Sequence, residues 1–318
     1  MTTTPSVPPA APQPGLFQRV RTFLELIKFS HTIFLLPFAF IATFLASRAI
    51  GQAWPGFLRL GLIVLCMVFA RTYAMTVNRL ADRRLDTLNP RTARRPSATG
   101  VLSPMFMAIC IALSGALFVA TAGLFYVFFH NIWPIVLALP VLAWVALYSF
   151  TKRFTWMCHF FLGSSLMLGP LAAWIAIAPP RGPVLAPQIL FLAFAVLFWS
   201  AGFDILYALQ DESVDRATGI FSLPARIGRR RALWVSRICH AVTIALLAAF
   251  GLGIIGGLRM GILYWCGFGV VIGLLAFEQS LVNVDDISRV NMAFMTVNGV
   301  LGVVFATLTI SDLLLRWR

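Results

Sequence analysis

Long apolar stretches recur along the whole chain and are separated by short polar or turn-forming segments. A membrane-spanning helix needs roughly 20 mostly apolar residues. Breaks fall at turn-forming sequences such as Trp54-Pro55-Gly56 and Gly256-Gly257. The pattern predicts an all-α polytopic membrane protein with about nine transmembrane helices. These helices are expected at 30–47, 58–77, 104–123, 132–149, 157–177, 188–208, 233–253, 261–280 and 294–314.

The composition agrees with this pattern and excludes an ordinary soluble protein. Of the 318 residues, 60% are hydrophobic and only 11% are charged, whereas soluble domains contain roughly a quarter charged residues. Residues 1–18 are rich in proline and lack the basic and apolar regions of a signal peptide, so they are predicted to be a disordered tail. Residues 19–318 are predicted to form one membrane domain. The five cysteines show no CxxC spacing and are expected to be packing residues.

The charged residues are distributed unevenly between the two sides of the predicted spans. A net charge of +14 suggests nucleic-acid binding in a soluble protein, but here most arginines lie in short loops, notably 79–103 and 209–232. The positive-inside rule then places these loops and the N-terminus in the cytoplasm and the C-terminus outside. Every acid except Asp312 lies on or near the same side, which the rule does not require. We therefore expect the acids to form a shared polar site on that side. Because most arginines lie in short loops between the spans, we expect no nucleic-acid partner.

Three polar residues follow one another at the cytoplasmic end of the second predicted span. Asn78, Asp82 and Asp86 are spaced by four residues, which on a helix places them on one face. Carboxylate oxygens suit Mg²⁺, which takes one or two carboxylates and fills its other positions with water and phosphates. The alternative is a solvated helix end at which neighbouring arginines neutralise the acids, namely Arg79, Arg83 and Arg84.

A second acidic group ends the sixth predicted span. Asp204, Asp211 and Asp215 share a helical face, and Asp204 follows an apolar run, where an ionisable group suggests a functional site. Tyr207 lies one turn from two of these acids and is expected to line the site; Tyr148 is a weaker second candidate. If the two acidic groups meet in the fold, they can surround one or two Mg²⁺ ions bound to a diphosphate.

Basic residues lie next to both acidic groups. Arg91 and Arg95 follow the first group, and Lys152 with Arg153 begins the loop after the fourth span. Guanidinium groups bind phosphate oxygens through two parallel hydrogen bonds. Arg71 lies within the second span, seven residues before Asn78 and therefore on nearly the same face. Because a cation among apolar residues of a membrane span requires an anionic partner, we expect Arg71 to have one. The histidines show no metal-ligand spacing and are interpreted as structural, namely His31, His130, His159 and His240.

These motifs resemble those of the UbiA superfamily of membrane aromatic prenyltransferases. Its first motif, N-x-x-x-D-x-x-x-D, is matched by Asn78, Asp82 and Asp86. Its second motif, D-x-x-Y-A-x-x-D-x-x-x-D, is matched by Asp204, Tyr207, Ala208, Asp211 and Asp215. The resemblance extends over nearly the whole chain after the tail and includes Asn89–Pro96, Tyr148–Arg153, Gly219–Ser222 and Asn291–Asn298.

The resemblance implies a nine-helix bundle around a lipid-accessible cavity, in which a prenyl group is transferred from an isoprenoid diphosphate to an aromatic ring. It implies that Asp82, Asp86, Asp211 and Asp215 hold Mg²⁺ and that Asn78 and Asp204 assist. The diphosphate would be met by basic residues, namely Arg91, Arg95, Lys152 and Arg153. Asp82, Asp204, Asp211 and Tyr207 are the expected catalytic residues, and Asn78, Arg71 and Tyr148 are expected to contact substrate.

Within the family, the motifs look most like bacterial 4-hydroxybenzoate polyprenyltransferases of respiratory quinone biosynthesis and their futalosine-pathway menaquinone relatives. The implied substrates are a polyprenyl diphosphate and an aromatic acid, with 4-hydroxybenzoate favoured, and the implied location is the bacterial inner membrane. A rival from another class is a cation-coupled transporter, which predicts acids near the middle of the bilayer and access from both sides.

Overall fold

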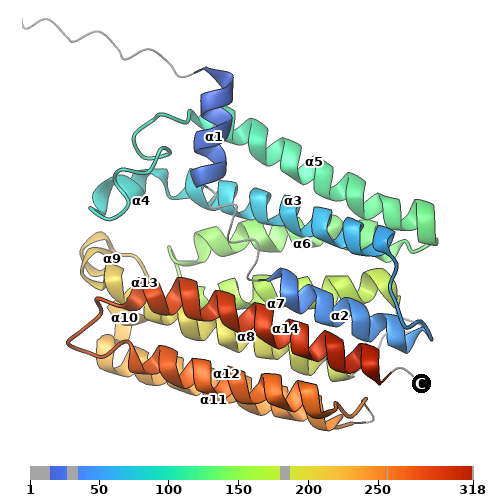
Figure 1. Cartoon of the computed structure of the whole chain (residues 1–318). Helices are drawn as coiled ribbons and strands as arrows, with labels where there is room; N and C mark the ends of the chain where they lie inside the picture. Colours follow the sequence, from blue (N-terminus) through green and yellow to red (C-terminus); the bar gives the residue numbers. More distant parts are fainter. Residues whose placement is uncertain (1–14, 27–34, 180–186, 256, 317–318) are drawn as a thin grey trace, which may run out of the picture.

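The structure is a computed structural model that describes residues 15–26, 35–179, 187–255 and 257–316. All regular elements in these ranges are helical (Figure 1). Eight helices are long and apolar enough to cross a membrane. They are α3 (Phe57–Ala81), α5 (Pro104–Phe129), α6 (Trp133–Thr151), α7 (Cys158–Ile177), α8 (Pro187–Ala208), α11 (Arg229–Leu252), α12 (Ile262–Ser280) and α14 (Asn298–Leu315), the last continuing α13 (Val290–Met292) and a π-helical turn (Ala293–Val297).

The predicted span at 30–47 corresponds to a shorter helix. Its described part is α2 (Leu36–Ala49), which has 14 residues, and positions 30–34 lie outside the described residues. The apolar pattern therefore predicted the helical membrane fold correctly. An additional helix, α1 (Leu16–Leu26), begins inside the segment that was assigned to the tail, so the predicted boundary at residue 18 lies within a helix. Phe23 and Leu26 explain this helix, because both are buried against Leu102 and Met107.

The long helices form one bundle around α2, α7 and α8. In Figure 1, α3, α5 and α6 form one part of the bundle, α11 and α12 lie on the other side of α8, and α14 packs against α2 and α12. Helix α8 packs against both α7 and α11, and α2 packs against α7 and α14. Glycines allow two of these close approaches: a Cβ at Gly163 would meet the Leu197 carbonyl oxygen at 2.5 Å, and one at Gly202 would collide with the His240 ring.

Two long helices are interrupted at the same end of the bundle. Helix α3 ends at Ala81, and α4 (Arg83–Leu88) begins after Asp82. Helix α8 ends at Ala208 and is followed by a 3₁₀ turn (Leu209–Asp211) and α9 (Glu212–Thr218). Asp82 therefore lies at the turn between α3 and α4, and Asp211 lies at the end of the 3₁₀ turn that follows α8. Helices α4 and α9 contact each other, so the two interruptions bring the acidic groups together (Figure 1).

The chain after α9 returns toward the place where α4 and α9 meet. Gly219 ends α9 in the left-handed conformation, with φ of 71°, which glycine adopts without steric cost. Ser222 then caps α10 (Leu223–Ile227) by accepting a hydrogen bond from the Ala225 backbone N–H. Residues 219–223 are therefore held as a short turn between two helices beside the acidic groups.

Candidate active site

A cavity with a volume of about 340 Å³ lies where the two acidic groups meet. Its walls come from α3, α4, α6, α7, α8 and α9 and from the segments that follow α4 and α9. Nearly all predicted site residues line it, namely Arg71, Asn78, Asp82, Asp86, Arg91, Arg95, Tyr148, Lys152, Asp204, Tyr207, Asp211 and Asp215. Arg153 is not among the lining residues, but it donates a hydrogen bond to Asp82, which does line the cavity.

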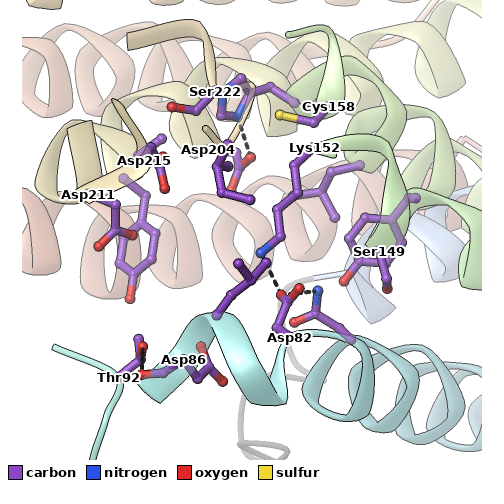
Figure 2. A pocket seen from close by; sticks show the side chains of 18 of the residues that line it. Asp82, Asp86, Thr92, Ser149, Lys152, Cys158, Asp204, Asp211, Asp215 and Ser222 are labelled. Carbon is purple, nitrogen blue, oxygen red and sulfur yellow. Dashed lines mark hydrogen bonds and ion pairs between the residues drawn. The ribbon is translucent and has the colours of Figure 1, made fainter. Parts of the chain in front are cut away.

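Asp82 is buried and paired with two cations from the loop after α6. Lys152 Nζ donates to Asp82 Oδ2 over 2.6 Å (Figure 2). Arg153 Nη2 donates to Asp82 Oδ1 over 3.2 Å. Asn78 Nδ2 donates to Asp82 Oδ2 over 3.3 Å. Arg153 also donates to the carbonyl oxygens of Ser149 and Ala81. These bonds tie the end of α3 to the end of α6, and they compensate a carboxylate that is withdrawn from water.

Asp86 is also buried and has a different partner. Arg95 Nη1 donates to Asp86 Oδ1 over 2.8 Å. Thr92 Oγ1 donates to the Asp86 carbonyl oxygen, which folds the segment after α4 back over the carboxylate. Asp86 Oδ2 is buried and has no hydrogen-bond partner among the described residues. One acceptor oxygen of this carboxylate is thus open to a cation.

Asp211 of the second group is held by residues of the first. Arg91 forms two hydrogen bonds to the Asp211 carboxylate, through Nε and Nη2, and Asn89 Nδ2 donates to Asp211 Oδ1 over 2.7 Å. Arg91 Nη1 donates to the Tyr207 hydroxyl oxygen over 2.8 Å. Burial alone would lower the pKa of Arg91, but its hydrogen bonds and the nearby charge of Asp211 outweigh burial and raise that pKa above its ordinary value. Arg91 is therefore a permanent cation between the two groups.

The solvated-helix-end interpretation of the first motif was wrong. The cations that pair with Asp82 and Asp86 come from other elements, namely Lys152, Arg153 and Arg95. Arg83 instead donates to the Ser97 carbonyl oxygen. Sequence spacing favoured near neighbours, whereas the fold brings in cations from α6 and from the segment after α4. Acids matched to distant cations in a cavity are typical of a binding site.

Among the described residues, no acidic side chain pairs with Arg71, for which an anionic partner was expected. It lines the cavity on α3, and its Nε is buried without a hydrogen-bond partner among the described residues. Arg79 lies two turns further along α3, is buried, lines the same cavity and also has an unpartnered Nε. Arg79 also donates to the Asn78 amide oxygen and lies near the charges of Asp86 and Asp82. Arg71 has no such acidic neighbour, so a buried guanidinium group that faces the cavity from this position suits an anionic ligand.

The deeper part of the cavity is apolar. Its lining there includes Leu35, Leu162, Leu166, Trp199 and Phe203. Trp199 Nε1 donates to Asn298 Oδ1 over 2.7 Å, and its ring packs edge-to-face on Phe203 with ring centroids 5.0 Å apart. One cavity therefore combines a charged end with an apolar, aromatic end.

Several lining residues were missed by sequence reasoning. Asn89 was noted only as part of a longer motif, and Arg79 only as a neighbour that neutralises the acids. His159, at the start of α7, was interpreted as structural. His159 instead lines the cavity and contacts Asp204, with 2.6 Å between Nδ1 and Oδ2. The sequence indicated only that a histidine begins an apolar span close to Lys152. His31 lies outside the described residues.

The carboxylates fit divalent-cation binding that is completed by a substrate. Asp82 and Asp86 lie across the cavity from Asp211 and Asp215 (Figure 2). Within the described ranges, no group of three acidic, histidine or cysteine side chains forms a ready metal-ion cage. Mg²⁺ usually takes only one or two carboxylates and completes its shell with water and substrate phosphates. The open Asp86 Oδ2 and the facing carboxylates match that mode.

The acids do not lie where a transporter would place them. Asp82 follows the last residue of α3, and Asp211 and Asp215 follow the end of α8. Asp204 lies within the last two turns of α8. Alternating-access transporters bind their ions near the middle of the spans. The acidic cavity is instead at one end of the bundle.

Comparisons with known proteins agree with this geometry. The chain matches the UbiA prenyltransferase family over residues 35–300. A protein named 4-hydroxybenzoate octaprenyltransferase from Nitrosospira multiformis is 33% identical over 261 residues, which cover 80% of this chain and 83% of the relative. The apo structure of a UbiA homolog from Aeropyrum pernix K1 is similar with a TM-score of 0.77 and 28% identity, covering 89% of this chain and 98% of that one. A UbiA homolog from Archaeoglobus fulgidus bound to GPP and Mg²⁺ shares the fold, with a TM-score of 0.65, 20% identity and coverage of 92% and 99%.

Proposed function

Because the chain belongs to the UbiA prenyltransferase family, we propose that it transfers a polyprenyl group from a polyprenyl diphosphate to an aromatic acid in respiratory quinone biosynthesis. 4-Hydroxybenzoate is the favoured acceptor, since several relatives are named 4-hydroxybenzoate octaprenyltransferases. The observation that supports the proposal most is the single cavity in which facing carboxylates and cations adjoin an apolar end. The same chemistry on a futalosine-pathway aromatic acid is the alternative.

The charged end of the cavity is the proposed diphosphate site. Asp82 and Asp86 on one wall and Asp211 and Asp215 on the other would hold Mg²⁺, with Asn78 assisting. Bound Mg²⁺ supplies positive charge that stabilises the departing diphosphate. Arg91, Arg95 and Lys152 line the cavity and pair with the carboxylates, and they would turn their hydrogen bonds to phosphate oxygens once cations occupy the carboxylates. Arg153, which was also expected to meet the diphosphate, does not line the cavity and would act through Asp82.

The apolar end is the proposed path of the prenyl chain. Leu162, Leu166, Trp199 and Phe203 offer a surface without charges, which favours an isoprenoid and excludes water. When the allylic C–O bond breaks, its electron pair leaves with the diphosphate, and the resulting cation requires such a water-poor pocket. Aromatic ring faces stabilise cations, and Tyr207 is fixed by Arg91 at the boundary between the two ends.

Arg71 is proposed to bind the carboxylate of the aromatic acid. It is the buried cation that lies further along α3 from the acidic end, and its Nε has no partner among the described residues. A guanidinium matches a carboxylate through two parallel hydrogen bonds. Tyr148 lines the same region from α6 and would contact the ring. This arrangement favours acceptors that carry an acid group.

The basic loops suggest how the protein sits in the membrane. The cavity lies at the end of the bundle where the arginine-rich segments 79–103 and 209–232 also lie. By the positive-inside rule, this end would face the cytoplasm of the bacterial inner membrane, with the N-terminus inside and the C-terminus outside.

A turnover assay tests the proposal. Purified protein in lipid is supplied with Mg²⁺, a long polyprenyl diphosphate and a panel of aromatic acids, and prenylated product and released diphosphate are measured with and without EDTA. We expect EDTA-sensitive product with 4-hydroxybenzoate. Product formed only with a futalosine-pathway acid would leave the reaction intact and change the pathway. Absence of product with every acceptor, in folded protein, would refute the proposal.

A further inference from the structure

His159 is buried beside the cavity, and both of its ring nitrogens are engaged. Its Nδ1 lies 2.6 Å from Asp204 Oδ2, and the Leu223 backbone N–H points at its Nε2 over 3.2 Å. The residue is 3% exposed and belongs to the first turn of α7. No other histidine in the described residues contacts an acidic motif.

These two partners determine which nitrogen of His159 holds the proton. A backbone N–H can only donate, so Nε2 of His159 must accept from Leu223 and has no hydrogen of its own. Nδ1 is then the protonated nitrogen of a neutral imidazole, and it donates to the Asp204 carboxylate. His159 thereby holds one carboxylate oxygen of Asp204 in a fixed direction, while the Asp204 side chain stays 24% exposed and lines the cavity.

The turn that supplies the Leu223 N–H is itself anchored. The Phe221 backbone N–H donates to the Lys152 carbonyl oxygen over 2.8 Å, and Cys158 Sγ lies 3.4 Å from the Phe221 carbonyl oxygen. The ammonium group of the same Lys152 binds Asp82. The ring of His159 is therefore held by a turn that is connected through Lys152 to the first acidic motif.

We propose that His159 is a positioning residue that presents the second carboxylate oxygen of Asp204 to the aromatic acceptor. This inference rests on the proposed function. As the allylic C–O bond breaks and its electron pair leaves on the diphosphate, a π-electron pair of the ring forms the new C–C bond. The proton on that ring carbon must then leave, and the Asp204 carboxylate takes it up and returns it to water. Asp204 acts on the substrate, and His159 acts through Asp204.

Two substitutions at His159 test whether its hydrogen bonds orient the Asp204 carboxylate. His159→Gln keeps one donor for Asp204 and one acceptor for the Leu223 N–H, whereas His159→Leu keeps neither. We expect His159→Leu to lower kcat by about 10-fold to 100-fold, since it removes a hydrogen bond to a charged group. The KM for polyprenyl diphosphate should change by less than about 3-fold, because the ring of His159 bonds to Asp204 and Leu223 and to none of the residues proposed to bind the diphosphate. His159→Gln should restore most of kcat.

A matched control is available in His240. It is equally buried, at 3% exposure, and its Nδ1 contacts Gln279 rather than an acidic residue. His240→Leu should leave kcat close to that of the wild type when the protein is folded. Thermal unfolding and gel filtration are run on every variant. If His159→Leu does not fold, His159→Asn replaces it, because its shorter amide cannot reach both Asp204 and Leu223.

The coupling between His159 and Asp204 in a double mutant gives a second readout. In an Asp204→Asn background, measured by single turnover, His159→Leu should cause no further loss, because the carboxylate that it positions is gone. Additive losses, a His159→Gln variant as inactive as His159→Leu, or a loss confined to the KM for polyprenyl diphosphate would each overturn the inference. These outcomes require an active wild-type enzyme, whereas failure of the proposed function is an inactive wild type.

Discussion

Arg91 and Asp211, which are 120 residues apart in the chain, form a two-point ion pair that joins the two acidic motifs. The same guanidinium group donates to the Tyr207 hydroxyl oxygen and lies over the Tyr207 ring. The segment after α4 is thereby fixed against the end of α8. Because Asp211 is a proposed metal ligand, Arg91 neutralises in this structure a carboxylate that would otherwise bind a cation.

Arg91→Lys should weaken diphosphate use. Lysine keeps the charge but cannot form two parallel hydrogen bonds. We expect kcat/KM for the polyprenyl diphosphate to fall by about 10-fold to 100-fold, which corresponds to the loss of a hydrogen bond between charged groups. Steady-state kinetics in lipid measure it. Arg94→Lys, an exposed substitution in the same segment, is the control, and equal losses in both variants would contradict the role of Arg91.

Asp82→Asn should abolish most activity without unfolding the protein. The amide can still accept from Lys152, but it no longer offers a charged oxygen to Mg²⁺. We expect kcat to fall by about 100-fold or more, because charge stabilisation of the leaving group is usually the largest contribution to catalysis. Asp286→Asn, the same change at an exposed acid outside the cavity, should be silent. Nearly full turnover in folded Asp82→Asn would exclude the two-motif metal site.

Mg²⁺ and a diphosphate should bind cooperatively. No ready cage of three ligands exists among the described residues, so Mg²⁺ alone should bind weakly and the substrate phosphates should complete its shell. A soluble prenyl diphosphate analogue at 100 times its Kd, added with Mg²⁺, should stabilise the fold by about 2.7 kcal/mol. Thermal unfolding with each component alone and with both together measures the effect. Strong stabilisation by Mg²⁺ alone would show a preformed site.

Arg71→Met should discriminate between acceptors. Losing the guanidinium should raise the KM for 4-hydroxybenzoate by about 10-fold or more, and it should have little effect on a neutral phenol of the same shape, which lacks the carboxylate. Parallel kinetics with the two acceptors make the comparison. Arg59→Met changes the same helix outside the cavity and serves as the control. An equal effect on both acceptors would mean that Arg71 does not bind the carboxylate.

Much of the fold and of the candidate site was predictable from local sequence. Apolar runs of helix length determined the membrane bundle, because unpaired backbone groups are not tolerated in lipid and helices satisfy them locally. The two spaced acidic motifs identified the residues that line the cavity, since their spacing and their position at span ends are local properties. The bends at Asp82 and after Ala208 were not predicted, because a polar helix end gives no sequence pattern that separates continuation from a break.

Only the tertiary structure decided which charges meet. Asp82 pairs with Lys152, Asp211 with Arg91, and Asp204 with His159, and each pair joins residues that are far apart in the chain. Charge interactions act over a few ångströms in space, so sequence proximity favoured Arg83 and Arg84, which do not pair with Asp82. The sequence by itself determined the membrane fold and the chemical groups of the site. Helix packing determined their partners, because it places the end of α8 against the end of α3.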